Sequence, residues 1–143
     1  MYKHILLAVD DTDASALALK EAIKFAKNQK AKLYIVHIVD TLYEGEADRE
    51  TFVDLTKKEG QKLLNTITKK LGRTIIEFEL KLSELTPSKS GIAEKIVHEA
   101  ELCTANLIMM GTHGHSRLNH ILSGSLVEEV IRIAKIPILI VRG

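Results

Sequence analysis

The residues best suited to chemistry in this sequence lie in one polar segment, Gly111 to Ser125, which three glycines punctuate. Glycine lets backbone amides approach an anion without an intervening side chain, and a helix N-terminus adds unsatisfied amides that carry partial positive charge. Gly111 and Gly114 could turn the chain around phosphate groups, while Gly124 and Ser125 would supply amides and a hydroxyl where a helix begins. Three or four hydrogen bonds to a charged group, each worth about 1.5 to 3 kcal/mol, would supply most of the roughly 8 kcal/mol that micromolar affinity requires. The segment is therefore chemically sufficient to bind a polyphosphate.

A purely structural role is the alternative for the end of this segment. Ser125 and Glu128 have the S-x-x-E spacing of a capping box, in which side chains bond the backbone amides of a helix start. One cap leaves other first-turn amides free, so a capping box and a phosphate site are compatible. The segment is not a Walker A loop, and Asp10 to Asp13, which follows the first apolar run, contains no glycine of a Rossmann fingerprint.

Three aspartates form a second candidate group, at an expected turn from strand to helix. Asp10, Asp11 and Asp13 could hold a metal or act as a base, but carboxylates at such a turn more often cap the helix. We interpret Asp11 and Asp13 as capping residues and Asp10 as the better ligand candidate.

Histidines in the glycine segment are a third candidate group. His113, His115 and His120 could suggest zinc or acid/base chemistry, but without a paired acid motif they are typical of solvent-exposed or phosphate-facing side chains. Arg117 could neutralise phosphates or simply be solvated. The sequence therefore predicts no metal site formed by protein side chains.

The apolar pattern predicts the elements that must position these groups. Short apolar runs typical of buried strands alternate with stripes of three- and four-residue spacing typical of helices. The expected strands are His4 to Val9, Leu33 to Val39, Thr74 to Leu82, Leu107 to Met110 and Pro137 to Val141. The expected helices centre on Leu19 to Ala26, Arg49 to Leu71 with Gly72 as its stop, Ile92 to Ala100 and Val127 to Ala134. This βαβαβαβαβ order predicts an open parallel sheet with helices on both faces, whose ligands bind beyond the carboxyl ends of the strands.

Length and composition set further limits. At 143 residues, with 45% hydrophobic and 27% charged residues, the chain is expected to form a single domain over residues 1–143. A formal net charge of +1 disfavours binding to nucleic acid or to anionic membranes. The short apolar run after Met1 predicts a buried strand and no secretory or spanning segment. Cys103 is the single cysteine, which favours a structural thiol and a reducing, cytoplasmic location.

These motifs resemble the universal stress protein family. Gly111-x2-Gly114-x9-Gly124-Ser125 matches the G-x2-G-x9-G-[ST] pattern of the family's ATP-binding branch. The resemblance extends to the N-terminal run from Lys3 to Asp10, the second strand and the ending from Ile136 to Arg142, so it covers effectively the whole chain.

The resemblance implies an adenine nucleotide alpha hydrolase-like fold with strand order 3-2-1-4-5, and ATP with Mg²⁺ as ligand. Asp10 matches the acid that contacts the adenosine, Ile38 the position whose backbone recognises adenine, and Met110 the border of the pocket. The residues implied for ATP binding are Ala8, Val9, Asp10, Ile38, Met110, Gly111, Thr112, His113, Gly114, His115, Arg117, Gly124, Ser125 and Leu126. A family dimer pairs last strands, which would place Ile138 to Val141 at a two-fold interface.

The resemblance therefore predicts an ATP-binding protein of stress response or regulation that acts through dimer and partner contacts. The chain departs from the family pattern in its long polar turn from Thr86 to Gly91 and in Asn106, where aspartate is common. The alternatives are a slow ATPase or nucleotidyl transferase, and a dimeric interaction module that needs no nucleotide. No familiar catalytic motif is recognisable, so any ATP hydrolysis is expected to be slow and incidental.

Overall fold

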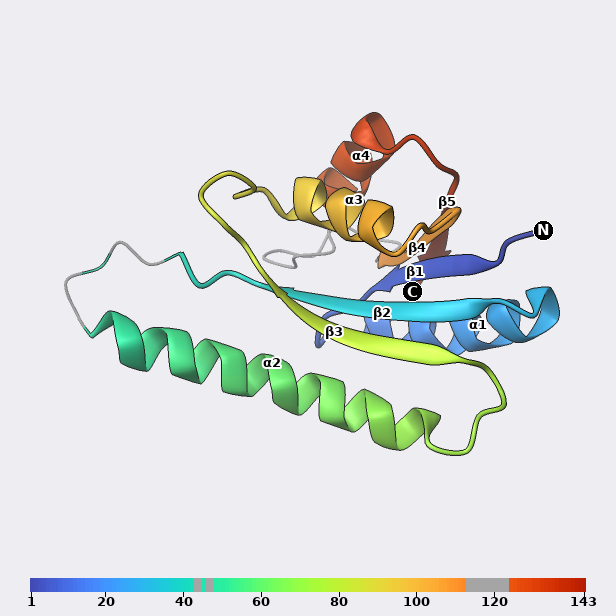
Figure 1. Ribbon diagram of the computed structural model, residues 1–143, viewed down its shortest axis with the longest axis horizontal. Coiled ribbons are helices and arrows are strands. Elements are labelled where there is room, and N and C mark those ends of the chain that lie inside the picture. The colour runs from blue at the N-terminus through green and yellow to red at the C-terminus, as the bar shows by residue number, and fades with distance from the viewer. Residues whose placement is uncertain (43–44, 46–47, 113–123) are drawn as a thin grey trace.

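The computed structural model describes residues 1–42, 45, 48–112 and 124–143, and these form one parallel sheet with helices on both faces (Figure 1). Its strands are β1 (His4–Ala8), β2 (Lys32–Val39), β3 (Phe78–Glu84), β4 (Leu107–Thr112) and β5 (Ile138–Arg142). Its helices are α1 (Asp13–Gln29), α2 (Arg49–Leu71), α3 (Ile92–Leu102) and α4 (Gly124–Ile133). The expected alternation of strands and helices is confirmed.

The strand order is β3-β2-β1-β4-β5, so the expected order 3-2-1-4-5 is confirmed. β1 is central, with Ala8 opposite Val36 of β2 on one side and Met110 of β4 on the other. The order reverses at β1, since the chain proceeds to β2 on one side of it and later to β4 on the other. The carboxyl ends of β1 and β4 therefore flank the switch point where sheets of this kind bind ligands.

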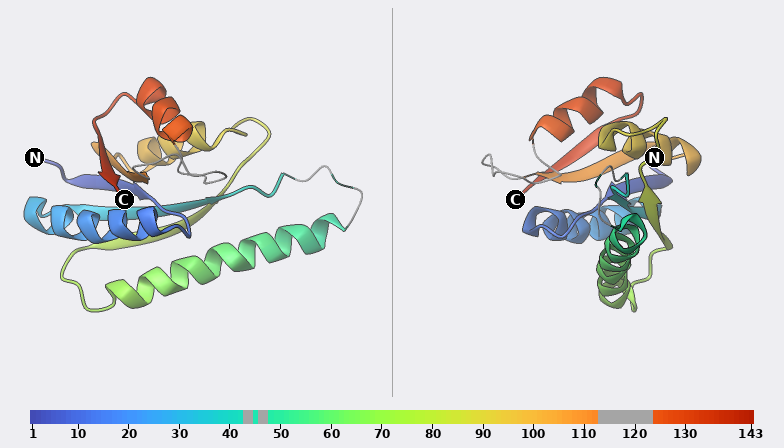
Figure 2. Two further views of the ribbon diagram at one scale, coloured as in Figure 1. Left: turned by 180° about the vertical axis from the view of Figure 1, so that it is seen from behind. Right: turned by 90° about the vertical axis from the view of Figure 1, so that its left-hand side faces the viewer.

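The helices divide into two pairs, and each pair covers one face of the sheet (Figure 2). α1 and α2 cover one face, where their apolar side chains pack on residues such as Ile5, Leu7 and Ile35. α3 and α4 cover the other face, over Leu6, Val36 and Met110 among others. Because successive strand residues point to opposite faces, one short apolar strand supplies both cores.

α1 begins at a cap that differs from the predicted one. Thr12 is the N-cap, and its hydroxyl accepts a hydrogen bond from the Ser15 amide at 3.2 Å. The prediction that Asp11 and Asp13 cap this helix is therefore wrong for the side-chain cap, although Asp13 lies in the first turn, where its charge suits the helix dipole. A threonine hydroxyl at the cap leaves the neighbouring carboxylates available for other contacts.

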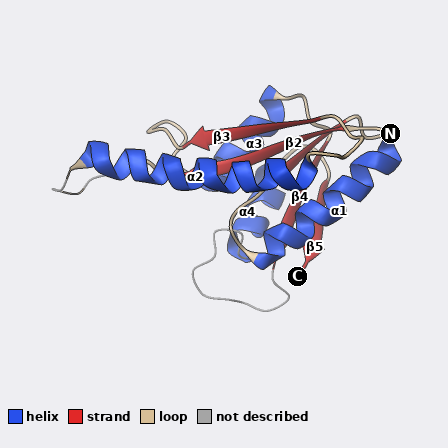
Figure 3. Ribbon diagram, turned by 90° about the horizontal axis from the view of Figure 1, so that it is seen from below, coloured by secondary structure: helices blue, strands red, loops and turns tan. Residues whose placement is uncertain are grey.

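α2 has the predicted bounds and crosses in front of the strands when the molecule is seen from below (Figure 3). Asp48 caps it by accepting from Thr51, and the helix ends before Gly72, as expected, although Gly72 keeps a right-handed conformation with φ −49°. Its buried face consists of Gly60, Leu64, Ile67 and Leu71.

β3 begins later than the alternation of its sequence predicts. The expected strand from Thr74 is wrong at its start, because Thr74 still bonds back to the carbonyl of Leu71 as the chain leaves α2. Pairing with β2 starts only where the amide of Leu33 donates to the carbonyl of Glu77 at 2.9 Å. The residues from 74 to 77 are used to turn from the helix into the sheet.

Candidate functional site

Asp10 lies two residues beyond the end of β1, and Gly111 is the last residue but one of β4, so both lie at the carboxyl edge of the sheet, on either side of the switch point. Ala8 and Met110 are partners in the β1–β4 register, so the next residues of both strands emerge side by side. The topology thus brings together two predicted site residues that are 101 positions apart in the sequence.

The carboxylate of Asp10 is buried at this edge, and one of its two oxygens has no partner among the described residues. Asp10 is only 6% exposed, and its Oδ1 accepts from both the amide and the hydroxyl of Thr12. Its amide donates to Oγ of the buried Ser15 at 2.8 Å. Its Oδ2 is buried and has no hydrogen-bond partner among the described residues. Because a buried carboxylate oxygen is costly without a donor, this atom is a ready acceptor for a ligand hydroxyl or for a cation.

Gly111 has a structural reason to be glycine. A Cβ at this position would lie 2.4 Å from the carbonyl oxygen of Ala14 and 3.1 Å from the Cβ of Ala18. The end of β4 therefore packs directly on the first turns of α1. The expectation that Gly111 turns the chain around phosphates is not tested by this contact, but close packing accounts for the absence of a side chain.

Ala8, Val9 and Ile38, which the resemblance implies for the nucleotide site, lie around the ends of β1 and β2. With Asp10, they border a cavity of about 10 Å³, which Val36, His37, Ile92 and Ile96 also line. Ile92 and Ile96 come from α3, which closes this space from the second face of the sheet. In this arrangement the cavity is far smaller than an adenine ring.

The phosphate side of the predicted site is described in part. Thr112 is the last residue of β4, and Gly124 begins α4, with Leu126 buried in the core beneath. Ser125 is exposed and is the second residue of that helix. The N-cap of α4 lies outside what the structure describes, so the capping box of Ser125 with Glu128 stays a prediction. His113, Gly114, His115, Arg117 and His120 lie outside the described residues, and the predictions for them remain predictions.

Sequence reasoning missed three side chains that hold Asp10 in place. Thr12 and Ser15 bond its carboxylate and its amide, and His37 bonds the carbonyl of Val9 at 2.8 Å. The only signal for Thr12 and Ser15 was their position at a helix start. His37 gave no signal, because a lone histidine in an apolar strand has no recognisable partner in the sequence.

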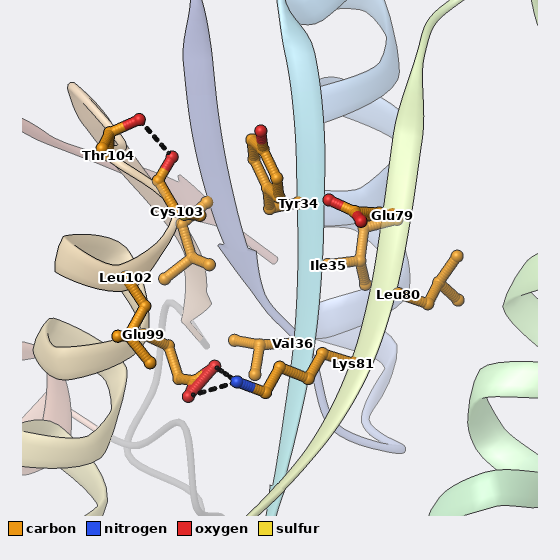
Figure 4. A pocket seen from close by; sticks show the side chains of 11 residues that line it. Tyr34, Ile35, Val36, Glu79, Leu80, Lys81, Glu99, Leu102, Cys103 and Thr104 are labelled. Carbon is orange, nitrogen blue, oxygen red and sulfur yellow. Dashed lines mark hydrogen bonds and ion pairs between the residues drawn. The ribbon is translucent and has the colours of Figure 1, made fainter.

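A larger pocket of about 470 Å³ lies elsewhere, over β2 between α3 and β3 (Figure 4). Lys81 reaches across it to Glu99, whose carboxylate is 5% exposed and accepts from Nζ at 2.9 and 3.0 Å.

Cys103 also lines this pocket. Burial raises the pKa of its thiol, and the charges of Glu99 and Glu79 add to the effect. The interpretation of Cys103 as structural agrees with that direction, because a protonated thiol is a poor nucleophile. None of the predicted site residues that the structure describes lines this pocket.

The described part of the chain contains no cluster of three histidine, cysteine or acidic side chains that could hold a metal ion. Within the same residues, none of the helices is both long enough and apolar enough to cross a membrane.

A five-stranded, doubly wound α/β protein with an acidic residue and a glycine at its switch point is the class that the fold and the site define. The chain belongs to the universal stress protein family, whose family model matches residues 1–142. A universal stress protein of Methanocaldococcus jannaschii is 35% identical over 146 residues, which span 99% of this chain and 83% of that protein. A solved structure of the family from Burkholderia pseudomallei has a TM-score of 0.81 at 27% identity and covers 98% of this chain and 96% of that one.

Two further solved structures of the family carry adenine nucleotides. The Arabidopsis thaliana protein, solved with AMP bound, has a TM-score of 0.71 at 14% identity and covers 98% of this chain and 91% of its own. A universal stress protein in complex with cAMP has a TM-score of 0.66 at 23% identity and covers 98% of this chain and 97% of its own. At these identities the likeness is one of fold.

Proposed function

We propose that this protein binds ATP, with Mg²⁺, at the switch point between β1 and β4, and acts in stress response or its regulation. The observation that carries the proposal is the buried Oδ2 of Asp10, which has no partner among the described residues. A ribose hydroxyl is a donor of the kind that this oxygen lacks. The AMP and cAMP bound by two proteins of the same fold support an adenine nucleotide as the ligand class.

The polyphosphate would extend from Asp10 toward the start of α4. Gly124 and Ser125 begin that helix, whose first amides are oriented to bind an anion. Mg²⁺ retains several water molecules and is usually held by phosphates and one or two carboxylates. The pattern Gly111-x2-Gly114-x9-Gly124-Ser125 supplies the intervening loop.

Adenine is the part of the ligand that requires a rearrangement. Its ring would be placed near the backbone of Ile38, where the cavity is about 10 Å³. Ile92, half-buried in the first turn of α3, must move aside for the ring to enter. The proposal thus includes a local opening of α3 when nucleotide binds.

Isothermal titration of nucleotide-stripped protein with ATP and Mg²⁺ tests the proposal, with AMP and cAMP as competing ligands. We expect micromolar affinity for ATP, and at least a tenfold loss in Asp10→Asn, because the replacement removes the charged acceptor. Asp13→Asn is the matched control, since Asp13 is an exposed aspartate three residues further on. The Asp10→Asn protein should fold about as stably as wild type, because asparagine keeps the oxygen that accepts from Thr12 and exchanges the unpaired carboxylate oxygen for a neutral amide nitrogen.

Two results would contradict the proposal. One is the absence of binding heat for all three nucleotides in the wild-type protein. The other is equal affinity in the wild-type and Asp10→Asn proteins, which would place the nucleotide away from the switch point. Phosphate release measured on the same samples distinguishes binding from the slow ATPase alternative.

A further inference from the structure

His37 makes a hydrogen bond that connects β2 to the chain leaving β1. Its Nδ1 lies 2.8 Å from the carbonyl oxygen of Val9, the residue that follows β1. A carbonyl oxygen can only accept, so Nδ1 carries the proton and donates it, whether or not the ring is charged. The histidine thus acts here as a fixed donor.

This bond restrains the peptide unit that carries Asp10. That unit consists of the carbonyl of Val9, which accepts from His37, and the amide of Asp10, which donates to Oγ of Ser15 at 2.8 Å. Both polar groups of one peptide are therefore bonded to side chains, one from β2 and one from α1. The amide of Val9 is held as well, because it donates to the carbonyl of Val36 at 2.9 Å. Together these contacts fix the direction in which the Asp10 side chain leaves the backbone.

α2 fixes the imidazole ring in turn. Gly60 is buried in the middle of α2, and a Cβ there would lie 3.3 Å from Cδ2 of His37, 3.0 Å from Cγ1 of Val39 and 2.7 Å from Cδ1 of Leu82. A glycine inside a helix costs about 1 kcal/mol relative to alanine, and here it allows the helix to pack on these side chains. The ring is consequently held between α2 and the sheet.

We propose that His37 is a positioning residue of the nucleotide site, which presents the carboxylate of Asp10 to the ligand through the Val9 carbonyl. The inference rests on the proposed function, because it assigns His37 a role in that same site. Without the donor, the Val9–Asp10 peptide rotates and the carboxylate turns toward solvent or toward other donors. Nucleotide then loses a prepositioned acceptor, although His37 itself does not touch it.

The test compares three variants by ATP titration and by thermal unfolding. His37→Leu removes the donor. His37→Asn retains one, because its amide nitrogen occupies nearly the place of Nδ1. Val39→Ala is the control, since Val39 packs on the same glycine of α2 but makes no bond to Val9 in the described structure. Amide hydrogen exchange at Asp10, measured by NMR without nucleotide, reports on the peptide directly.

We expect His37→Leu to lose about tenfold in ATP affinity and to exchange the Asp10 amide faster. His37→Asn should recover most of the affinity and the protection, whereas Val39→Ala should lower the melting temperature and leave both unchanged. Wild-type affinity in His37→Leu would overturn the positioning role alone. Failure of the wild-type protein to bind any adenine nucleotide would instead overturn the proposed function, and this inference with it.

Discussion

The α-carbon of Gly111 lies against the carbonyl of Ala14, so closely that a Cβ would stand 2.4 Å from that oxygen. Ala14 lies in the first turn of α1, and the next residue, Ser15, bonds the amide of Asp10. The absence of a side chain at Gly111 therefore determines how closely the first turn of α1, which holds Asp10, can approach the end of β4.

Gly111→Ala should both destabilise the protein and weaken nucleotide binding. The added methyl group meets backbone, which cannot rotate away, so we expect a loss of about 2 kcal/mol or more in the free energy of unfolding, measured in urea. Displacement of Ala14 also moves Ser15 and should lower ATP affinity. Gly72→Ala is the control: its nearest contacts would be 3.5 and 3.7 Å away and its φ is −49°, so no loss is expected. If Gly111→Ala were as stable as Gly72→Ala, the prediction would be wrong, because β4 and α1 could then separate without a loss of free energy.

Lys81→Met should destabilise the protein more than is usual for a lysine that is largely exposed. It leaves the carboxylate of Glu99, which is 5% exposed, without its cation. Because solvent can reach the 56%-exposed lysine, we expect a loss of about 1 to 3 kcal/mol in urea unfolding, less than for a fully buried pair. The double variant Lys81→Met, Glu99→Leu should recover most of it. Lys24→Met breaks an exposed ion pair with Glu21 and should change the free energy of unfolding little. A loss as large as that of Lys81→Met would refute the role of burial.

In the folded protein, alkylation of the single cysteine, Cys103, should be slow, and its rate should rise only at a higher pH than for an ordinary thiol. Burial raises the pKa of Cys103, so less of the reactive thiolate is present at about pH 8 than in an unfolded chain. The rate of iodoacetamide labelling, followed by mass spectrometry, should rise on unfolding and should rise with pH above the range of an ordinary thiol. Equal labelling rates in the folded and unfolded protein would contradict a buried environment for this thiol.

The same raised pKa makes stability depend on pH. The contribution of Cys103 to stability is complete below the thiol pKa of the unfolded chain and is lost as pH rises through the higher pKa of the folded protein.

The last strand is the proposed contact of a homodimer, and its backbone suggests a selective test. β5 is an edge of the sheet. The carbonyl of Pro137 and the amide of Gly143 both bond to β4, so by alternation the amide of Ile140 points away from β4, along the free edge. Ile140→Pro should therefore remove an edge donor without loss of a bond to β4.

We expect the wild-type protein to sediment as a dimer and Ile140→Pro as a folded monomer, with circular dichroism as the check on folding. Leu139→Pro is the contrasting variant, since its amide faces β4 and its loss should damage the sheet itself. A dimer that persists in a folded Ile140→Pro protein would place the interface elsewhere.

Features that depend on neighbours in sequence were predicted well. The bounds of α2 agree with the prediction at both ends, and the strands β1, β2, β4 and β5 agree within about two residues, because period and capping are local properties. β3 was predicted four residues too early, since alternation alone cannot tell a strand from the extended turn that leads into it. At the site, the position of Asp10 at a strand end was predictable, but the groups that bond it were not.

The succession of elements, the family and the position of Asp10 and Gly111 near the carboxyl ends of their strands could be predicted from the sequence alone, because each follows from local spacing or from a contiguous motif. Only the tertiary structure decided which oxygen of Asp10 is left without a donor, why Gly111 has no side chain, and that His37 and Lys81 bond to Val9 and Glu99. These properties depend on the packing of segments that are far apart in the chain, which places each polar group in or out of reach of a partner. A pattern of residue types along the sequence carries no record of those distances.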